Sequence, residues 1–554
     1  MTRVLITTFS HLAQEALDSF REAFVDALVT AGNEVLLMRT EDFMKSPYAS
    51  NDLKDEVDEA ALAAHLREAA PEAVVSFNHS GLFPALLAQA DVPIGVWLAD
   101  GPAYLVDPAA FTREAGRYRV FVPSRAFMSE LAAGYGVAVS RLSWLPFCTD
   151  FRAEDLEQTI PISFVGTFFH TIGFLRKLSR QHASPATWER LRALVDSYRD
   201  DQATPFARRL AAHRLEHVLG DPFDEAGLLN TLSLSRRLHV LEAVCDLGLR
   251  IYGNARWLEA LPFSADLVFA FQREGVHRRA ELQALYNRSR LALSVSHAQA
   301  RGGVPWRVFD IMATNAVLVS DRQPDLVELF PGLGLPVFDS PAEAREACAG
   351  LLGDEARRRE LSSAAQAAVE QGHRFPHRLA RMGEELGVDL LPGGRGGLRR
   401  LDGRAFARLG GSPAPSPDEG TRWPFKVLFS ETTRFAAGRS ARKWCRIAAG
   451  GRLDVRVRLD AAPGFLRLDP GEAFSVHRDP VLTVECLSGE GTAPVGAAEI
   501  DLSAGAVASS QIRVEEGPRG RRLTCGGDPQ FVFRNPFPGR DIEVRFQSIV
   551  EAVL

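Results

Sequence analysis

Short apolar runs alternate with longer segments of helical period along the first 155 residues, and this pattern predicts a parallel, doubly wound α/β sheet. We expect strands at residues 4–9, 34–38, 73–77, 94–98 and 118–122. A helix before the second strand carries Ala16, Phe20, Phe24 and Leu28 on one face and ends at Gly32. Residues 1–155 are therefore predicted to form one Rossmann-like domain.

Polar residues follow several of these strands. Ligands of open α/β sheets bind beyond the carboxyl ends of the strands. This rule predicts a cleft at Asn78, His79, Asp100 and Ser124.

A second α/β domain is predicted for residues 156–386. Its first strand begins at Ile162, and a helical pattern broken by Pro185, Pro205 and Pro222 then occupies residues 174–248. The alternation of strand and helix resumes at Leu249 and continues to a helix that ends near residue 386. We interpret residues 174–248 as a helical insertion.

The stretch 291–330 is the most informative part of this second domain. A short apolar strand leads into Gly302 and Gly303, and Pro305 then suits the first position of a helix. The amides at that helix start, with Arg307, favour an anion, and Asp310 lies one turn further on. The stretch predicts a nucleotide diphosphate pocket; an ordinary turn with a surface ion pair is the alternative.

The last third of the chain changes character. Residues 387–423 are rich in Gly, Pro, Ser and Arg without apolar periodicity, which predicts a linker. Residues 424–554 show alternating apolar segments between glycine and proline turns, which predicts a β-sandwich of jelly-roll type. Its aromatic residues could stack on a sugar, but we favour core filling for most of Trp423, Trp444, Phe465 and Phe474.

Composition narrows the possible partners and compartment. The 554 residues include 64 basic and 70 acidic side chains, a net charge of −6, so no global basic surface indicates nucleic acid. The six cysteines are far apart, without the short spacings of zinc or redox motifs, which fits a reducing cytoplasm. We see no signal peptide and no apolar stretch long enough to span a membrane, and we expect a cytoplasmic protein.

Several short motifs follow one another in order along residues 1–386. They are Trp97-Leu98-Ala99-Asp100, Trp144-Leu145-Pro146-Phe147, Phe164-Val165-Gly166-Thr167 with Arg176, Ile251-Tyr252-Gly253-Asn254 with Trp257, Glu281-Leu282 with Leu285-Tyr286-Asn287, and Arg307-Val308-Phe309-Asp310. Together they resemble the CgeB-like, spore-maturation-type glycosyltransferases of bacteria. The resemblance implies the GT-B fold, in which two Rossmann-like domains face a cleft.

The resemblance also implies an activity. A nucleotide-sugar donor would bind in the second domain and a glycan or glycoprotein acceptor mainly in the first, with hexosyl transfer between them. No Asp-x-Asp sequence is present, so neither a metal nor another cofactor is expected. Asp310 matches the family's acidic position for the ribose hydroxyls. A related GT-B pattern has a second acidic residue earlier in the same loop. Gly302 occupies that position here, so we expect His297 or Arg301 to contact the donor sugar in its place.

Arg307 and Arg176, with the backbone of Gly166 and Thr167, are our predictions for stabilising the departing diphosphate. For Arg176 a solvated helix position is an equal alternative. The remaining donor-site predictions surround these residues: Tyr252, Gly253 and Asn254 at a strand end, Val308 and Phe309 in the helix motif, and Gln272 to Val276 near the base.

An inverting reaction needs a base near the acceptor hydroxyl, and Asp100 is our first choice. His79 is second, and His170 lies on the opposite wall; each has a structural role as its alternative, and a retaining enzyme would have no such base. For Tyr286 we favour core packing. We interpret His373, Arg374, His377 and Arg378 as a basic surface.

Two other functions stay open at this point. One is a scaffold protein that binds a nucleotide sugar or glycan without turnover, and the other is a GT-B-type epimerase that converts donor without acceptor. The sequence specifies neither the sugar, nor the acceptor, nor the oligomeric state.

Overall fold

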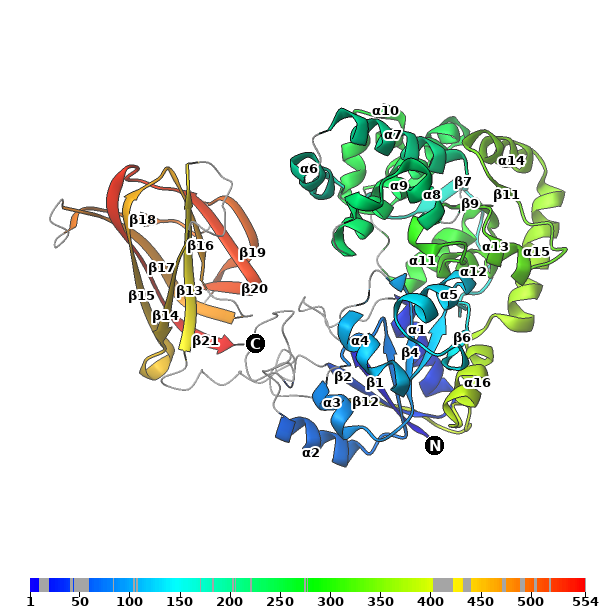
Figure 1. Cartoon of the computed structure of the whole chain (residues 1–554), viewed down its shortest axis with the longest axis horizontal. Coiled ribbons are helices and arrows are strands. Elements are labelled where there is room, and N and C mark those ends of the chain that lie inside the picture. The colour runs from blue at the N-terminus through cyan, green and yellow to red at the C-terminus, as the bar shows by residue number, and fades with distance from the viewer. Residues whose placement is uncertain are drawn as a thin grey trace.

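The computed structural model describes most of the chain, in three parts (Figure 1). The described residues are 1–8, 19–39, 43, 59–82, 84–102, 105, 108–169, 171–181, 184–201, 204, 206–219, 222–273, 276, 278–401, 422–431, 440–470, 475–488, 494–502, 506–517 and 520–553. In this described part, no helix has the length and apolar character needed to cross a membrane.

The first part is a parallel sheet of seven strands in the order β12-β2-β1-β3-β4-β5-β6 among the described residues. Its strands are β1 (Arg3–Thr8), β2 (Glu34–Arg39), β3 (Ala73–Phe77), β4 (Ile94–Trp97), β5 (Tyr118–Val122), β6 (Leu142–Trp144) and β12 (Gly397–Leu401). The five strands predicted from the apolar runs are confirmed to within one or two residues at each end.

Helices cover both faces of this sheet, which makes it doubly wound. They are α1 (Ser19–Thr30), α2 (Glu59–Ala69), α3 (Pro84–Gln89), α4 (Pro108–Glu114) and α5 (Arg125–Gly134). Phe20, Phe24 and Leu28 of α1 are buried against Val4 and Ile6, as the helical pattern predicts. Helices α2 to α5 contribute to a separate core on the opposite face. Ala16 of the predicted α1 face lies outside the described residues.

The second part is a parallel sheet in the order β11-β10-β9-β7-β8. Its strands are β7 (Ile160–Val165), β8 (Leu249–Tyr252), β9 (Ser289–Ser294), β10 (Val317–Asp321) and β11 (Val337–Phe338). Between β7 and β8 stand α6 (Ile172–Gln181), α7 (Pro185–Asp200), α8 (Phe206–His213) and α9 (Pro222–Ala243), where a helical insertion was predicted. The later helices are α10 (Ala265–Ala270), α11 (Arg279–Asn287), α12 (Trp306–Met312), α13 (Pro324–Leu329), α14 (Pro341–Gly353), α15 (Glu355–Gly372) and α16 (Phe375–Leu386). The two facing Rossmann-like domains are the GT-B architecture that was predicted.

Two segments near residue 386 return to the first domain. Helix α16 packs beside the first sheet (Figure 1), and the Ser143 hydroxyl donates a hydrogen bond of 2.7 Å to the Glu385 carboxylate. Strand β12 pairs in parallel with β2 at the edge of the same sheet. The prediction that residues 387–423 are all linker is therefore wrong for β12. The sequence of β12 shows no strand pattern, because Leu398 is exposed, only Leu401 is buried, and the other residues are Gly and Arg.

The third part is an antiparallel β-domain, and the jelly-roll type of sandwich stays a prediction. Its strands are β13 (Arg422–Ser430), β14 (Ser440–Arg446), β15 (Arg452–Ala462), β16 (Phe465–Asp469), β17 (Ser475–Leu487), β18 (Pro494–Ile500), β19 (Ala506–Gly517), β20 (Gly520–Arg534) and β21 (Arg540–Val553). All are hydrogen-bonded in one sheet, which curls so that the Lys443 ammonium of β14 donates to the Arg456 carbonyl of β15. Trp423 is buried in the core that this sheet encloses, and its indole N–H donates to the Pro470 carbonyl.

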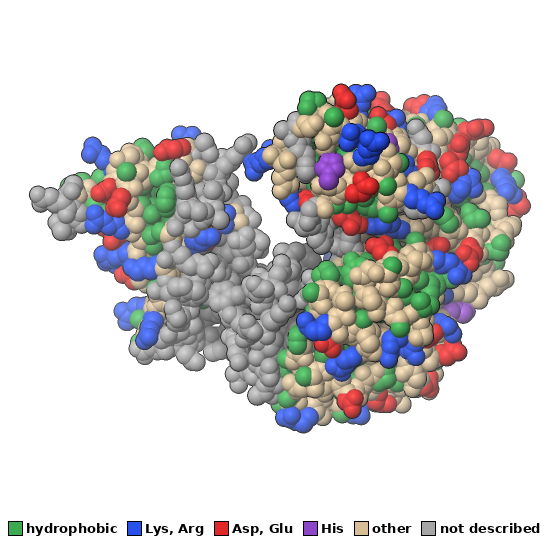
Figure 2. All heavy atoms as spheres, viewed as in Figure 1, with side chains coloured by type: hydrophobic (Ala, Val, Ile, Leu, Met, Phe, Trp, Pro, Cys, Tyr) green, Lys and Arg blue, Asp and Glu red, His purple; other side chains and the backbone are tan. Residues whose placement is uncertain are grey.

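Acidic and basic side chains are interspersed over the face of the α/β domains that Figure 2 shows. This mixture agrees with the nearly balanced numbers of acidic and basic residues in the chain.

Chains ending at Leu401 and at Gly396 test the contribution of β12. The longer chain keeps the strand that covers β2, and we expect it to melt several degrees higher because the shorter one loses the buried Leu401 and a row of ladder hydrogen bonds. Thermal denaturation of the two chains measures the difference. Equal melting temperatures would show that β12 adds nothing to the first domain.

Candidate functional site

A pocket of about 290 Å³ lies between the two α/β domains. The first domain contributes the loops after β4 and β5 and the start of α5; the second contributes the end of β7, α9 and the loop before α12. The polar lining includes Asp100, Ser124, Thr167, Asn230, Arg237, His297, Gln299 and Arg307. Five of these, Asp100, Ser124, Thr167, His297 and Arg307, were predicted for the cleft or the donor site, so the structure brings together groups from both predicted halves.

The loop at residues 296–305 forms the centre of the pocket wall. Asp321 at the end of β10 fixes its start by accepting hydrogen bonds from the Ser296 backbone N–H and hydroxyl, at 3.1 and 2.9 Å. At its other end Gly303 presses against the first domain, where a Cβ would come within 2.6 Å of the Ser124 Cβ. A glycine is required at residue 303 because another domain, rather than a ligand, approaches its backbone.

Two arginines bring positive charge into the pocket. Arg237 on α9 is almost fully buried and donates to the Thr167 carbonyl at 2.9 Å and the Val295 carbonyl at 3.3 Å. Its guanidinium also lies 4.4 Å from the centre of the Phe169 ring. Burial, and then the positive charge of Arg307, lower the pKa of Arg237 to about 9. The pocket thus contains two positive charges that repel each other, and the Asp321 charge offsets part of this effect on Arg237.

Arg237 was not predicted from the sequence, whereas Arg176 was. Arg176 lies on the exposed face of α6 and does not line the pocket, so its predicted place at the diphosphate is wrong. Arg237 instead belongs to the helical insertion, where arginines are frequent and no local motif distinguishes it. Its contact with Thr167 follows only from the packing of α9 under the end of β7.

Asp100 faces the pocket from the first domain, as predicted. Its carboxylate accepts hydrogen bonds from the Asn78 side-chain amide at 2.7 Å and from the Gln299 side-chain amide at 2.9 Å. Asn78 has a positive φ of 53°, which Asn tolerates, and its carbonyl oxygen accepts from the backbone N–H groups of Ala99 and Asp100. The orientation of Asp100 thus depends on a residue of each domain.

His79 does not reach the cleft. It is 2% exposed, and its Nε2 lies 3.0 Å from the Tyr118 hydroxyl in the core of the first domain. Its φ of 61° turns the side chain away from the end of β3. The prediction that His79 faces the acceptor is therefore wrong, and His170, the third base considered, lies outside the described residues.

His297 lines the pocket in a neutral form. Its ring accepts a hydrogen bond from the Gln299 backbone N–H through Nδ1, so Nε2 carries the proton and donates to the Asn230 side-chain carbonyl at 2.9 Å. Burial, and then the charge of Arg237, lower the pKa of His297 to about 3. The imidazole thus adds no third positive charge to this site near neutral pH.

Asp310 lies beneath the pocket rather than in its lining. Its carboxylate accepts a hydrogen bond of 2.6 Å from the hydroxyl of Thr149, in the segment that joins the domains. Burial raises the pKa of Asp310 to about 7, against the opposing effects of the Thr149 hydrogen bond and the Arg307 charge. Its contact with a ribose stays a prediction. The neighbouring Val308 and Phe309 are buried core residues.

The glycine motifs at the ends of β7 and β8, around Gly166 and Gly253, pack against each other. A Cβ on Gly253 would lie 2.1 Å from the Gly166 carbonyl oxygen, which also accepts from the Trp257 indole at 2.8 Å. Asn254 bonds both backbone groups of Phe168 through its side-chain amide. Tyr252 is buried with Ile160 and Leu285. Gln272 donates its backbone N–H to the Ile251 carbonyl, and part of residues 272–276 lies outside the description.

The predicted basic surface at residues 373–378 is also wrong. Arg378 is 7% exposed and donates to the carbonyls of Pro146 and Phe147, at 2.6 and 2.8 Å. Arg374 donates to the carbonyls of Thr149 and Phe151. These arginines therefore fasten the interdomain segment. Among the described residues, no three His, Cys, Asp or Glu side chains are grouped to hold a metal ion.

Comparison with known proteins finds one family model, described as "Glycosyl transferase-like", which matches residues 236–384. This segment, from α9 through α16, is glycosyltransferase-like; the CgeB-like type stays a prediction. A search of curated proteins finds no match.

Several solved structures resemble about 70% of this chain at low sequence identity. The Anabaena Alr3699/HepE complex with UDP-glucose has 10% identity and a TM-score of 0.44, and covers 70% of this chain and 100% of its own. The T4 phage BGT complex with UDP and Mn²⁺ has 12% identity, a TM-score of 0.41 and the same coverage. A Rickettsia africae glycosyltransferase has 13% identity and a TM-score of 0.38, covering 71% of this chain and 99% of its own. The fold assignment rests on the strand order.

The Asp310→Asn variant tests the buried carboxyl. The folded chain keeps its proton up to a pKa of about 7, whereas an unfolded chain releases it near pH 4, so this group's stabilising contribution is lost as pH rises between these values. The variant has no such loss. We expect its melting temperature, relative to the native chain, to increase from pH 5 to pH 8, with exposed Asp266→Asn as the control. A pH-independent difference would contradict the raised pKa.

Proposed function

We propose that this protein transfers a hexosyl group from a nucleotide-diphosphate sugar to a hydroxyl of a glycan or glycoprotein, without a metal ion, as a CgeB-like glycosyltransferase. The observation that carries the proposal is the pocket in which Arg237 and Arg307 converge from the second domain while Asp100 faces them from the first. The glycosyltransferase-like match of residues 236–384 includes both arginines.

The positive charges of the pocket support binding of a nucleotide-diphosphate donor. A diphosphate carries negative charge that increases on the leaving group as the bond to the sugar breaks. Arg307 lies in the first turn of α12, and Arg237 on α9 bonds the Thr167 carbonyl. Both arginines line the pocket, so in our proposal both donate charge-assisted hydrogen bonds to phosphate oxygens. In this proposal the two arginines supply the positive charge that a metal supplies in other transferases.

Asp100 is the proposed base that receives the proton of the acceptor hydroxyl. In an inverting transfer the acceptor oxygen bonds to the anomeric carbon as the bond to the diphosphate oxygen breaks, and the acceptor proton passes to a base. Each Asp100 oxygen accepts one hydrogen bond from an amide and retains a second lone pair for that proton. The Asn78 and Gln299 amides fix the carboxylate, so the base is oriented before the acceptor binds.

The compartment is part of the same proposal. The six cysteines are free, and four of them, Cys148, Cys348, Cys486 and Cys525, are buried. Free cysteines are typical of a reducing environment, and nucleotide sugars as substrates suit the cytoplasm, to which we assign the protein.

A panel of nucleotide sugars tests the proposal directly. Each compound is added to the full chain, and the melting temperature and the release of nucleoside diphosphate are measured. A matched donor should raise the melting temperature, because a ligand that binds only the native state stabilises it by mass action. Binding without release of diphosphate, with or without acceptors, would favour a scaffold, and no binding at all would reject the proposal.

Arg237→Ala should weaken donor binding by roughly 10- to 150-fold, which corresponds to the loss of a charged hydrogen-bond donor worth about 1.5 to 3 kcal/mol. Isothermal calorimetry with the matched donor measures the change. Arg176→Ala is the control, since that arginine is exposed on α6, and it should bind as the native chain does. Arg307→Ala at the pocket wall should repeat the effect if the buried Arg237 variant melts too low to assay.

Asp100→Asn should abolish sugar transfer while donor affinity stays within about twofold of the native value. The substitution keeps the shape of the side chain and removes the acceptor for the proton. Transfer rate and donor affinity are measured on the same preparation. A variant that still transfers sugar at the native rate would exclude Asp100 as the base.

A further inference from the structure

A second and larger cavity, of about 620 Å³, adjoins the interdomain pocket. One wall is α5 of the first domain, and the other is made by the inserted helices α7, α8 and α9. The lining includes Ser129, Glu130, Tyr198, Phe206, Ala207, Leu210, Glu225, His297, Arg301 and Pro324. His297 and Arg301, the two residues that the sequence suggests for the donor sugar, both belong to this lining, whereas Arg237 and Arg307 do not.

The two cavities are neighbours along the same elements. His297 lines both of them. Helix α5 also lines both, with Phe127 at the pocket and Ser129 and Glu130 at the second cavity. These positions lie within one helical turn, a rise of about 5.4 Å. A ligand that lies along α5 could therefore have one unit in each cavity.

The charges of the second cavity are balanced, unlike those of the pocket. Arg301 forms ion pairs with Glu225 of the insertion and with Glu130 of α5, the latter at 3.6 Å. Burial raises the pKa of Glu130, which brings this carboxyl closer to its neutral form. Arg209 is paired with Asp201 at 3.1 Å. The lining therefore has no surplus of positive charge to attract a phosphate.

Aromatic rings and polar groups share this lining. Phe206 lies under the Arg301 guanidinium at 4.8 Å, and Tyr198 lies under that of Arg209 at 5.5 Å. Apolar surface beside a few oriented polar groups is the usual composition of a site for a neutral ligand. A sugar ring has such a mixed surface, because C–H groups cover its faces and hydroxyl groups surround its edge.

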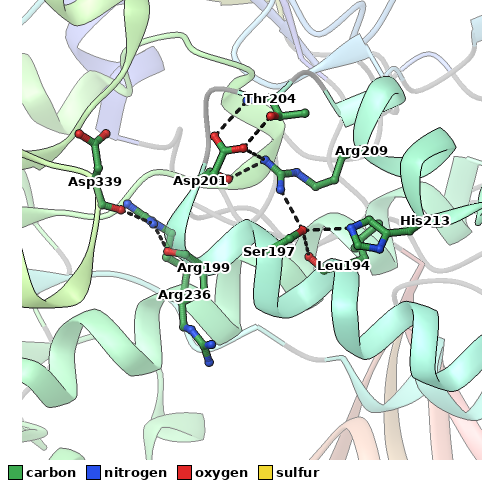
Figure 3. A network of polar contacts seen from close by, with 9 residues as sticks. All are labelled: Leu194, Ser197, Arg199, Asp201, Thr204, Arg209, His213, Arg236 and Asp339. Atoms are coloured by element: carbon green, nitrogen blue, oxygen red, sulfur yellow. Dashed lines mark hydrogen bonds and ion pairs between the residues drawn. The ribbon is translucent and has the colours of Figure 1, made fainter.

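The wall made by the insertion is held by hydrogen bonds. Figure 3 shows Arg209 between the Ser197 hydroxyl and Asp201, with Thr204 and His213 bonded to the same two residues. In the same view Arg236 donates to the Arg199 and Asp339 carbonyls, which ties α9 to the end of α7 and to the loop after β11. These bonds fix α7 against α8, so the cavity is built before a ligand binds.

We propose that this second cavity binds a neutral sugar unit of the acceptor, next to the unit that receives the transferred sugar in the pocket. This inference rests on the proposed function, because it assigns the acceptor of that same reaction to the class of oligosaccharides or glycosides. The inserted helices thus select an acceptor of at least two units, and the first domain alone does not form the acceptor site.

Ala207→Trp tests the assignment by filling the cavity. Ala207 is exposed on α8 and lines the cavity, so an indole there occupies the space without disturbing the core. Ala212→Trp is the matched control, because Ala212 is exposed on the same helix and does not line the cavity. Ser129→Trp fills the cavity from α5 and replaces Ala207→Trp if that variant does not fold.

The native chain and both variants are applied to a printed array of neutral mono-, di- and trisaccharides, and donor hydrolysis is measured on the same samples. We expect a set of glycans of two or more units to bind at least tenfold more weakly to Ala207→Trp than to the native chain and equally well to Ala212→Trp, with equal donor hydrolysis in all three proteins.

The inference would be overturned by the same array pattern in all three proteins, by binding of single sugar units only, or by no bound glycan. Lost hydrolysis in Ala207→Trp would place the cavity in the donor site and also overturn it. If the native chain hydrolyses no nucleotide sugar, the proposed function fails, whereas the array still decides whether the cavity binds carbohydrate.

Discussion

The contact between the loop at residues 296–303 and the first domain is the constraint on which the rest of the site depends. Gly303 lies so close to Ser124 that a Cβ would overlap it, and Gln299 reaches across to Asp100 at 2.9 Å. The pocket exists only while this loop holds the two domains together. Any movement that separates them also removes one of the two amide donors from Asp100. The position of the proposed base is thereby coupled to the position of the domain that carries the two arginines.

The positive charges that line the pocket favour a bound anion. Burying the Arg237 guanidinium is costly, and two carbonyl oxygens, the faces of Phe164 and Phe169 and the charge of Asp321 compensate for part of this cost. The charge of Arg307 adds repulsion, which is why the pKa of Arg237 falls to about 9. Neutral His297 adds no further positive charge, since its pKa is about 3. An anion between the arginines would convert the repulsion into two attractions, so the pocket complements a diphosphate better than it complements water.

The sequence predicts those features of the fold that depend on local pattern. The buried strands of the first sheet are short apolar runs between turn residues, and both of their ends could be placed within one or two residues. Asp100 could be placed at the cleft because it lies just beyond the end of β4 at Trp97. Strand β12 was missed because its single buried residue, Leu401, gives no periodicity, and its partner β2 lies more than 350 residues away. Pattern alone does not show pairing over such a distance.

The errors at the site have the same origin. His79 follows a strand as Asp100 does, but its left-handed backbone turns the ring toward Tyr118. Arg374 and Arg378 look like a basic surface in sequence, and each is instead bonded to carbonyls of the interdomain segment. Arg237 has no local signature, because its partners are at Thr167 and Val295. A cation's role is set by what lies opposite it, and only the packed chain shows this.

In our proposal, the difference in charge between the two cavities separates the donor from the acceptor within one interdomain space. The smaller pocket has two arginines without a balancing pair of carboxylates in its lining, so it favours the anionic donor. The larger cavity pairs Arg301 with Glu225 and Glu130, so an anion gains little there and a neutral ring loses little. Arg301 has a left-handed backbone with φ of 49°, a conformation that costs about 1–3 kcal/mol, and it persists because the ion pairs on both sides hold it. His297, which lines both cavities, lies at the boundary between them, where in our proposal a donor and an acceptor meet.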